Sequence, residues 1–370
     1  INYRLGALGF LAHPSLGPAG DVGNYGLADQ QAALRWVRDN IANFGGDPGK
    51  VTVAGASAGG ISVCDHLVAP GSKGLFRAAI IQSAPCQAQA DLPTAEQRSL
   101  DYAAQAGCGD AATAAQCLRA LPVDKLRKPA LYFNIGSDAL TGPVTGTKLL
   151  PVDPVTAITR DDAARVPVLI GTNRDEFRLF VALRYLRQGE SYATERYPEL
   201  LREAFGNRAI AVAERYPLDN YGGSVPLAYS AAVTDGVFAC VTDRMSDDLA
   251  EVGPVFAYEF NDRDVPAPDP MHTLPFPVGA GHSLELRYLF DVGGPPALNP
   301  EQQQLSDAMI DYWSKFITAG VPAAAGQPDW PPLGADTAAA PRMSLQADGS
   351  RAITDFDQIH QCPFWVSPER

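Results

Sequence analysis

The chain has 370 residues, of which 46% are hydrophobic, 9% aromatic and 19% charged. These apolar side chains can fill a large core, which excludes an intrinsically disordered protein. Asp and Glu (42) outnumber Lys and Arg (29), for a formal net charge of −13, and this disfavours nucleic acid as a partner because phosphate backbones are bound by clustered cations. No stretch approaches the roughly 18 consecutive apolar residues of a membrane span, so we expect no membrane partner either.

We interpret the first six residues, Ile-Asn-Tyr-Arg-Leu-Gly, as a strand from the middle of a fold. The chain begins with Ile rather than Met, and no charged-then-apolar signal region comes before this strand. We therefore expect the natural protein to have residues before Ile1.

An amphipathic helix is predicted over residues 27–41, because apolar residues recur there at helical spacing and a Gly-Gly-Asp-Pro stop follows. A β-branched run over 51–54 predicts a short strand, and a helical pattern over 61–67 follows it. Ser57 lies between the two. The sequence therefore predicts a serine in a strand-to-helix turn.

Further short apolar runs alternate with helical patterns and predict an α/β fold, with a mostly parallel sheet flanked by helices. Residues 177–250 lose strand character, and we interpret them as a helical insertion that shapes a substrate cleft. Loops rich in Pro are predicted over 266–277 and 322–341. The other predicted elements are strands over 78–83, 166–171, 255–260 and 286–290, and a helix over 302–317.

The turn around Ser57 matches the Gly-x-Ser-x-Gly pattern of a nucleophile elbow through Gly55 and Gly59. The glycines allow a strained turn that presents the serine hydroxyl, and the motif needs a strand before it and a helix after it. The alternative is a glycine-rich turn that only packs a helix against a strand. Because both flanking elements are predicted, we favour Ser57 as a nucleophile.

A nucleophilic serine needs a base, and in this fold the chain order is serine, carboxylate, histidine. Three histidines lie well downstream of Ser57. His282 follows Gly-Ala-Gly and precedes an apolar run, whereas His272 lies in a Pro-rich loop and His360 lies next to Cys362. The best candidate for the base is therefore His282.

The carboxylate that orients the base is expected beyond the carboxyl end of a parallel strand. The strand predicted over 166–171 is followed by Asp175 and Glu176, and both fit. The alternative for either residue is a solvated charge or a carboxylate at a helix start. From the residues alone, Asp175 and Glu176 remain equal candidates.

Taken together, these stretches resemble the type-B carboxylesterase family along nearly the whole chain. The resemblance implies one α/β-hydrolase domain over 1–370, lacking its N-terminal strands and loops, with the helical insertion at 177–250. It also implies an absent N-terminal segment, which would be a partner of this chain. The matching motifs lie at residues 2–6 with 9–11, at 23–30, at 40–48 and around Ser57.

The resemblance also implies roles for particular residues. The Gly-Thr-x-x-Asp-Glu stretch makes Glu176 the triad acid, and Gly-His-Ser-x-Glu makes His282 the base that also returns the proton. Ser83 and Glu285 match positions that support the histidine without touching substrate. Ser57 is the nucleophile.

For the oxyanion hole, the backbone N–H of Ala58 is the one donor expected within this chain. The resemblance implies that the other donors come from a glycine-rich loop upstream of Ile1. Three interpretations of this gap stand: a piece of a longer protein, a proteolytic fragment associated with its N-terminal part, or a truncated form of low activity.

The family usually has Glu before the nucleophile, where this chain has Ala56.

The six cysteines lack the paired spacing of a zinc site, so we expect no metal. Their even number suits disulfides and an oxidising compartment, and a secreted protein is expected. The resemblance implies two bridges, Cys108 with Cys117 and Cys240 with Cys362. A third, between Cys64 and Cys86, is a hypothesis.

The function predicted is a serine carboxylesterase that hydrolyses a small-molecule carboxylic ester, short-chain or aromatic, through an acyl-enzyme. No motif implies a cofactor. The alternatives are a non-catalytic binding or adhesion module on the same fold, or an amidase or a specialised polymer or toxin esterase on the same triad.

Overall fold

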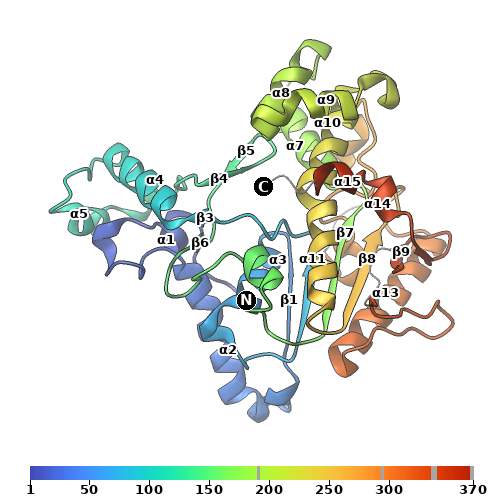
Figure 1. Cartoon of the computed structure of the whole chain (residues 1–370), viewed down its shortest axis with the longest axis horizontal. Coiled ribbons are helices and arrows are strands. Elements are labelled where there is room, and N and C mark those ends of the chain that lie inside the picture. Colours follow the sequence, from blue (N-terminus) through green and yellow to red (C-terminus); the bar gives the residue numbers. More distant parts are fainter. Residues whose placement is uncertain (190–191, 293–295, 335–339, 367–370) are drawn as a thin grey trace. The chain divides into compact units, whose positions relative to one another are not determined.

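The computed structural model describes residues 1–189, 192–292, 296–334 and 340–366 of the chain. The chain divides into two compact units, and each is described by itself (Figure 1). The interpretation of the chain as one domain with an insertion stays a prediction. Unit 1 comprises residues 1–53, 61–77 and 86–164, and unit 2 comprises residues 54–60, 78–85 and 165–370.

A six-stranded sheet runs in the order β1-β2-β7-β8-β9-β10. The pairs β2–β7, β7–β8 and β8–β9 are parallel, and β10 runs antiparallel to β9. With helices on either side, this sheet confirms the predicted α/β fold. The strands span Thr52–Ala56 (β1), Ala78–Gln82 (β2), Val168–Asn173 (β7), Val255–Phe260 (β8), Arg342–Leu345 (β9) and Arg351–Ile353 (β10).

The central strands β2, β7 and β8 are buried along their whole length, as expected for strands that are covered on both faces. Gly171 of β7 pairs with Tyr258 of β8. A Cβ atom on Gly171 would lie 2.4 Å from the Tyr258 ring, so this position needs glycine. Strand β7 ends two residues later at Asn173, so the residues that follow lie at the carboxyl edge of the sheet.

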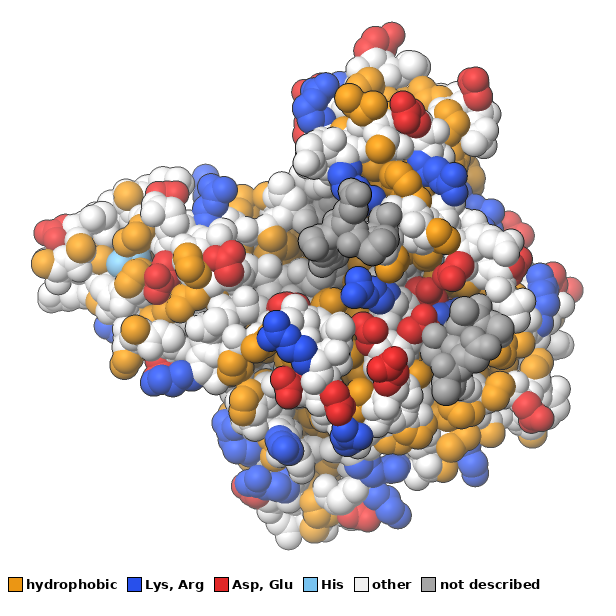
Figure 2. All heavy atoms as spheres, viewed as in Figure 1, with side chains coloured by type: hydrophobic (Ala, Val, Ile, Leu, Met, Phe, Trp, Pro, Cys, Tyr) orange, Lys and Arg blue, Asp and Glu red, His pale blue; other side chains and the backbone are white. Residues whose placement is uncertain are grey.

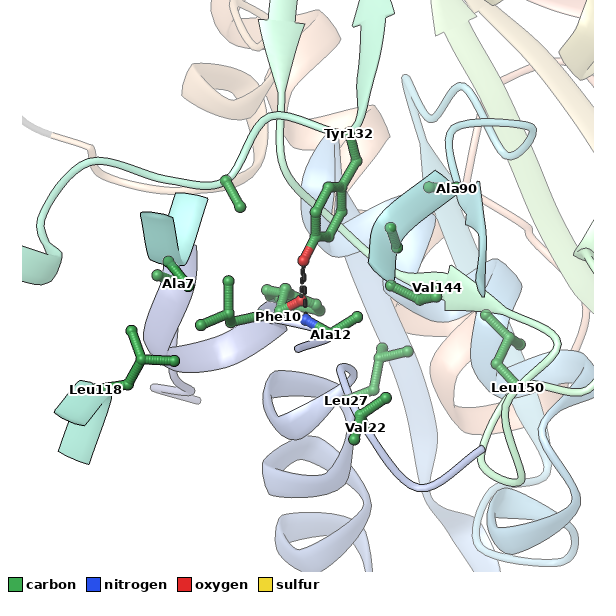
Figure 3. Close-up of a cluster of buried hydrophobic side chains, with 14 of the residues drawn as sticks. Ala7, Phe10, Ala12, Val22, Leu27, Ala90, Leu118, Tyr132, Val144 and Leu150 are labelled. Carbon is green, nitrogen blue, oxygen red and sulfur yellow. Dashed lines mark hydrogen bonds between the residues drawn. The ribbon is translucent and has the colours of Figure 1, made fainter. Parts of the chain in front are cut away.

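Unit 1 is mainly helical around an apolar core (Figure 3). The Tyr132 hydroxyl crosses this core: it accepts from Ala12 N (2.9 Å) and donates to Phe10 O (2.7 Å). The predicted helices over 27–41 and 61–67 are present as α2 and α3. The elements span Gly6–Phe10 (α1), Tyr25–Asn40 (α2), Ala58–Val68 (α3, beginning in unit 2), Leu92–Gln105 (α4), Ala114–Ala120 (α5), Pro154–Thr159 (α6), Ala90–Asp91 (β3), Phe133–Ile135 (β4), Asp138–Leu140 (β5) and Val144–Thr145 (β6).

The strand predicted over residues 1–6 is wrong. Residues 1–5 form no regular element, and helix α1 begins at Gly6. A strand needs a neighbour for its backbone groups, but the Arg4 N–H donates to the Asp29 side chain (3.0 Å) and the Arg4 guanidinium binds the same carboxylate. This contact with α2 replaces a strand pairing.

Between β7 and β8, unit 2 is helical, as predicted for residues 177–250. Residues 225–250 form one continuous helix that contains a π-helical turn. Its length and mean hydropathy of 1.3 would suffice to cross a membrane, but 67% of its most apolar window is buried inside the protein, as in a core helix. The elements span Arg178–Gln188 (α7), Tyr197–Phe205 (α8), Ala209–Arg215 (α9), Val225–Val233 (α10), Thr234–Ala239 (η9, the π-helical turn) and Cys240–Ala250 (α11).

The strand predicted over 286–290 is also wrong, because residues 286–289 form helix α12. Tyr288 is fully buried, and its carbonyl accepts from Ser306 of the long helix α13 (2.8 Å). An apolar run this short does not distinguish a buried helical turn from a strand, and here the packing partner is a helix. The elements span Leu286–Leu289 (α12), Pro300–Ala319 (α13), Phe356–Ile359 (α14) and Cys362–Trp365 (α15).

All six cysteines are paired in three disulfides, as expected for two of the pairs and as hypothesised for the third. Cys108–Cys117 and Cys64–Cys86 lie within unit 1, and Cys240–Cys362 joins α11 to α15 in unit 2. Three disulfides are consistent with an extracellular protein or one of the endoplasmic reticulum lumen.

On the face shown in Figure 2, acidic side chains are interspersed with basic ones.

Candidate active site

The predicted nucleophile Ser57 lies at a sharp turn between β1 and α3 in unit 2. Its φ of 56° is left-handed, which is unfavourable for a residue with a Cβ atom. Its backbone N–H donates to Gln82 O on β2 (2.9 Å). Gly55 makes the turn feasible, because a Cβ atom there would lie 2.2 Å from Gly59 O, whereas a Cβ atom on Gly59 would have no neighbour within 4 Å. The turn therefore has the backbone geometry that the motif predicts, and Ala58 is the first residue of the helix.

Of the two candidate carboxylates, only Glu176 contacts His282. Glu176 Oε2 lies 2.6 Å from His282 Nδ1. Its other oxygen, Oε1, accepts from Thr172 Oγ1 (2.8 Å) and from Asn173 N (2.7 Å). The Glu176 side chain is fully buried, and these donors hold its charge in place of water.

Asp175 points to a different set of partners. Arg263 binds it through two hydrogen bonds of 2.7 and 2.8 Å, and Arg178 lies 2.9 Å from it. The Ala280 N–H donates to Asp175 Oδ2 (3.1 Å), and Gly279 approaches so closely that a Cβ atom there would lie 2.3 Å from the same oxygen. Asp175 thus fixes the loop that precedes His282.

His282 is buried in this loop, and its backbone N–H donates to Glu176 O (3.1 Å). The ring centroids of Phe180 and Phe238 lie 4.9 and 5.6 Å from the centroid of the imidazole ring. Burial works against protonation of His282, but the charge and hydrogen bond of Glu176, with a contribution from Glu285, outweigh it and raise its pKa. The imidazole is therefore oriented by Glu176 and shielded by aromatic rings.

The second nitrogen of His282, Nε2, is buried and has no hydrogen-bond partner in the part of the chain that the structure describes. A buried polar atom without a partner is unfavourable and marks a position where a reacting group can bind. Among the described residues no hydrogen bond joins His282 to Ser57. Hydrogen bonds to a catalytic base are often long before substrate binds.

Behind the histidine, Glu285 and Asn173 form a second buried layer. Asn173 Nδ2 donates to Glu285 Oε2 (2.6 Å) and to Gly281 O (2.8 Å). Burial and the charge of Glu176 raise the pKa of Glu285 to about 7. The charge of Glu285 contributes to the raised pKa of His282, and Asn173 links Glu285 to the Gly281 carbonyl beside His282. Ser83 is buried with a φ of 51°, and its hydroxyl has no partner among the described residues.

Sequence reasoning missed three residues of this site. Thr172 and Asn173 bind the carboxylate of Glu176, and Thr234 Oγ1 accepts from the N–H of the next residue, Phe177 (3.0 Å). The signal for the first two was their position at the end of β7, immediately before the acidic pair. Thr234 lies 57 residues from its partner, so no local pattern indicated it.

One group of potential metal ligands occurs among the described residues: Asp243, Asp357 and Cys362. The Cys362 sulfur is bonded to Cys240, and Arg342 forms an ion pair with Asp243. With its thiol oxidised and one carboxylate neutralised, this group lacks the ligands of a metal site.

The chain is similar to known proteins over almost its whole length. The family model "Carboxylesterase family" matches residues 1–365. The chain belongs to the carboxylesterase family. It is 33% identical to the pyrethroid hydrolase Ces2e of Rattus norvegicus, 31% to an acylcarnitine hydrolase of the same species and 30% to the cocaine esterase of Homo sapiens.

Each of these alignments covers 99% of this chain but only 64% or 65% of the related carboxylesterase. The chain therefore spans less than two thirds of the length of these relatives.

Proposed function

We propose that the protein is a serine carboxylesterase and that Ser57, His282 and Glu176 form its catalytic triad. The observation that carries this proposal is the hydrogen bonding of the two ring nitrogens of His282. Glu176 fixes its Nδ1, while its Nε2 is buried and has no partner in the described part of the chain. The elbow geometry of Ser57 and membership of the carboxylesterase family support the same assignment.

In the proposed reaction, Ser57 Oγ attacks the ester carbonyl, and the hydroxyl proton of Ser57 passes to His282 Nε2. The attack converts the carbonyl into a tetrahedral oxyanion. The carbonyl re-forms as the alkoxide leaves, and the alkoxide takes that proton from His282. Water then attacks the acyl-enzyme with His282 again as the base, releasing the carboxylic acid and Ser57. Glu176 stays ionised and stabilises the imidazolium in both halves of the reaction.

The oxyanion is proposed to bind the backbone N–H of Ala58, the first residue of α3. In the family that the chain resembles, further donors lie on a glycine-rich loop outside the residues matched here. The greater length of the relatives supports this source, and the segment that carries the loop would be a partner of this chain.

The substrate is proposed to be a small carboxylic ester with a short-chain or aromatic acyl group. The related proteins carry names of ester-cleaving enzymes, among them a cocaine esterase. Phe180 of α7 and Phe238 of η9 lie beside His282, so the helices over 177–250 would shape the apolar wall of the substrate cleft. A panel of nitrophenyl esters of graded acyl length measures this preference.

The decisive test is active-site labelling of the natural full-length protein. A fluorophosphonate probe should label it covalently with one equivalent, and Ser57→Ala should abolish both labelling and ester hydrolysis. Ser314→Ala, an exposed serine on α13, is the matched control and should behave as wild type. Folded wild-type protein that neither reacts with the probe nor cleaves esters would instead indicate a binding or adhesion module.

We also propose that the protein is secreted. All six cysteines are paired, and disulfides persist in oxidising compartments. Thiol alkylation of the protein in its native cells, without a reducing agent, should leave all six cysteines unmodified. Full alkylation in a cytosolic fraction would contradict this localisation.

A further inference from the structure

A small polar cavity lies behind the turn that carries Asp175. Its volume is about 130 Å³, enough for about four water molecules or one small ion with water, since a water takes up about 30 Å³. Helices α7 and α10, the π-helical turn η9 and the segment after α14 contribute to its walls. The lining residues that matter here are Arg174, Arg178, Tyr221, Ser230, Arg263 and His360.

Three arginines gather at this cavity around fewer carboxylates. Arg178 and Arg263 share the single carboxylate of Asp175. Arg174 lies 3.3 Å from Glu259, which it shares with another cation. Burial lowers the pKa of Arg178, and repulsion by Arg263 and Arg174 adds to this effect, against the charge of Asp175.

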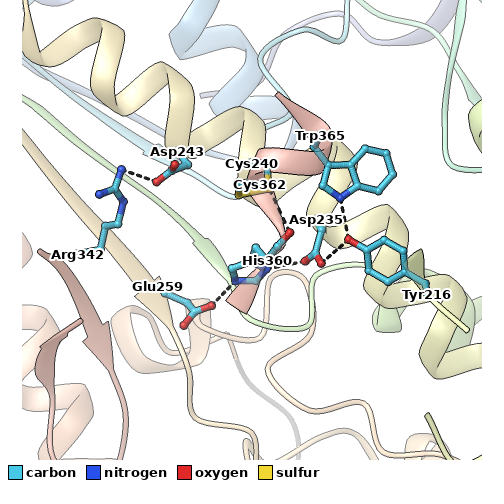
Figure 4. The surroundings of a disulfide bond; sticks show 9 residues. All are labelled: Tyr216, Asp235, Cys240, Asp243, Glu259, Arg342, His360, Cys362 and Trp365. Atoms are coloured by element: carbon cyan, nitrogen blue, oxygen red, sulfur yellow. Dashed lines mark hydrogen bonds and ion pairs between the residues drawn. A yellow bond between two sulfur atoms is a disulfide. The ribbon is translucent and has the colours of Figure 1, made fainter. Parts of the chain in front are cut away.

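The fourth cation is His360, whose two ring nitrogens both face carboxylates (Figure 4). Nδ1 lies 2.6 Å from Asp235 Oδ1, and Nε2 lies 2.6 Å from Glu259 Oε1. Ionised carboxylates only accept hydrogen bonds, so both nitrogens must carry a hydrogen and the ring is an imidazolium. Its neighbours raise the pKa of His360 to about 9, against the effect of burial.

The charges at the cavity therefore do not balance. Arg174, Arg178, Arg263 and His360 supply four positive charges. Their direct partners Asp175, Asp235 and Glu259 supply three negative charges. Asp264 also acts on Arg263, but it lines the larger neighbouring cavity and not this one. Among the groups in direct contact at the small cavity, an excess charge of one in a partly buried site favours a bound counter-ion.

An unpaired hydroxyl points to the same conclusion independently of charge. Ser230 is fully buried, lines the cavity, and its Oγ has no hydrogen-bond partner in the described part of the chain. A buried hydroxyl without a partner is costly and is normally satisfied by water or a ligand. Beside four cations, it would serve as a donor to an anion.

We propose that this cavity binds one small monovalent anion, of the size of a halide or a short carboxylate, between the arginine side chains and the Ser230 hydroxyl. The anion neutralises the excess charge and completes the hydrogen bonds of Ser230. Through Arg178 and Arg263 it stabilises Asp175, which holds the loop of His282 by its bond to Ala280 N.

The small cavity lies next to a larger one. A larger cavity of about 970 Å³ shares Arg174, Arg263 and Ile359 with the small one. Asp262 and Asp264 line the larger cavity but not the small one. The two acids would disfavour anions in the outer cavity, so the proposal assigns the binding site to the inner one.

The test is anion binding to the natural full-length protein, measured by thermal unfolding at constant ionic strength. Chloride, bromide and acetate replace gluconate, which is too large for the cavity. We expect Tm to rise and to saturate with the small anions, because a ligand that binds only the folded state stabilises it. A response to acetate alone would identify the ligand as a carboxylate, and a response to all three as any small monovalent anion.

Variants identify the site. Ser230→Ala should weaken anion binding several-fold, and Arg174→Gln should weaken it roughly tenfold or more, because it removes a charge-assisted hydrogen bond. The control Arg38→Gln changes an exposed arginine that pairs with Asp39 and should bind as wild type. Tm curves without saturation, or equal anion affinity in wild type and both cavity variants, would overturn the proposal.

Discussion

Unit 2 contains two buried histidines that contact carboxylates, and they differ in their second nitrogen. His282 has one nitrogen bound to Glu176, and the other has no partner in the described part of the chain. His360 has both nitrogens bound, to Asp235 and to Glu259. Burial and a carboxylate contact are thus common to both rings, and only the unbound nitrogen distinguishes them.

This difference separates a base from a structural cation. A histidine acts as a base through a neutral nitrogen that can accept a proton, and Nε2 of His282 meets this condition. His360 has no nitrogen left to accept one, and its ring packs against Phe356 (4.5 Å between centroids) close to the Cys240–Cys362 disulfide. A carboxylate beside a histidine is therefore weak evidence of catalysis by itself.

The largest expected effect comes from removing the single carboxylate that orients His282. Glu176→Gln should lower kcat/KM by about 10³–10⁴-fold, because an amide no longer fixes the tautomer or stabilises the imidazolium. Ester hydrolysis at saturating and limiting substrate measures this change.

Asp175→Asn is the matched control for that variant. It removes the charge shared by Arg178 and Arg263, so it should lower Tm while leaving much of the activity. An equal loss of kcat/KM in folded Asp175→Asn and Glu176→Gln would contradict the assignment of Glu176 as the triad acid.

His360→Gln should act on stability rather than on catalysis. The folded-state pKa of His360, about 9, is above the ordinary value of 6.5, so its stabilisation is complete below pH 6.5 and is lost as pH rises through 9. The raised pKa of His360 contributes on the order of 3 kcal/mol to the free energy of unfolding at low pH. Urea unfolding of wild type, with its disulfides intact, should therefore show a falling free energy of unfolding over this range.

The variant should show that decline reduced, and its kcat/KM should change far less than that of Glu176→Gln. His272→Gln, in the 3-10 helix Asp269–Thr273 outside this network, is the control. A pH dependence that is identical in wild type and His360→Gln would contradict the role of His360 as a buried cation.

The sequence predicted the parts of the site that depend on local pattern. The elbow at Ser57 has a strand before it and a helix after it, as the motif requires. Asp175 and Glu176 were equal candidates, because adjacent residues share the same local signals. What separates them is the turn after β7, which directs Asp175 to Arg263 and Glu176 to His282.

Features that depend on distant partners were not predicted. The partners of His360 lie 125 and 101 residues away, so its position next to Cys362 gave no sign of a cation site. The segments 1–6 and 286–290 were assigned as strands from local sequence, which does not reveal the neighbour that a segment packs against. Pairing of β9 with β8 likewise depends on a contact far along the chain.

The smallest expected effect concerns how the surroundings of His282 set its titration. The charge of Glu285 contributes to the raised pKa of His282, after the larger contribution of Glu176. Glu285→Gln removes that charge but keeps an acceptor for Asn173 Nδ2. The acidic limb of the kcat/KM profile, which follows deprotonation of His282 in the free enzyme, should move to lower pH by a few tenths of a unit.

The plateau of kcat should change little, because Glu285 does not contact the reacting atoms in the proposed mechanism. Glu251→Gln, an exposed acid after α11, is the control and should leave the limb in place. An unmoved limb would mean that Glu285 is neutral over this pH range and acts on His282 only by hydrogen bonding, through Asn173 and Gly281. The presence or absence of the shift thus distinguishes an electrostatic role for the buried acid from a purely structural one.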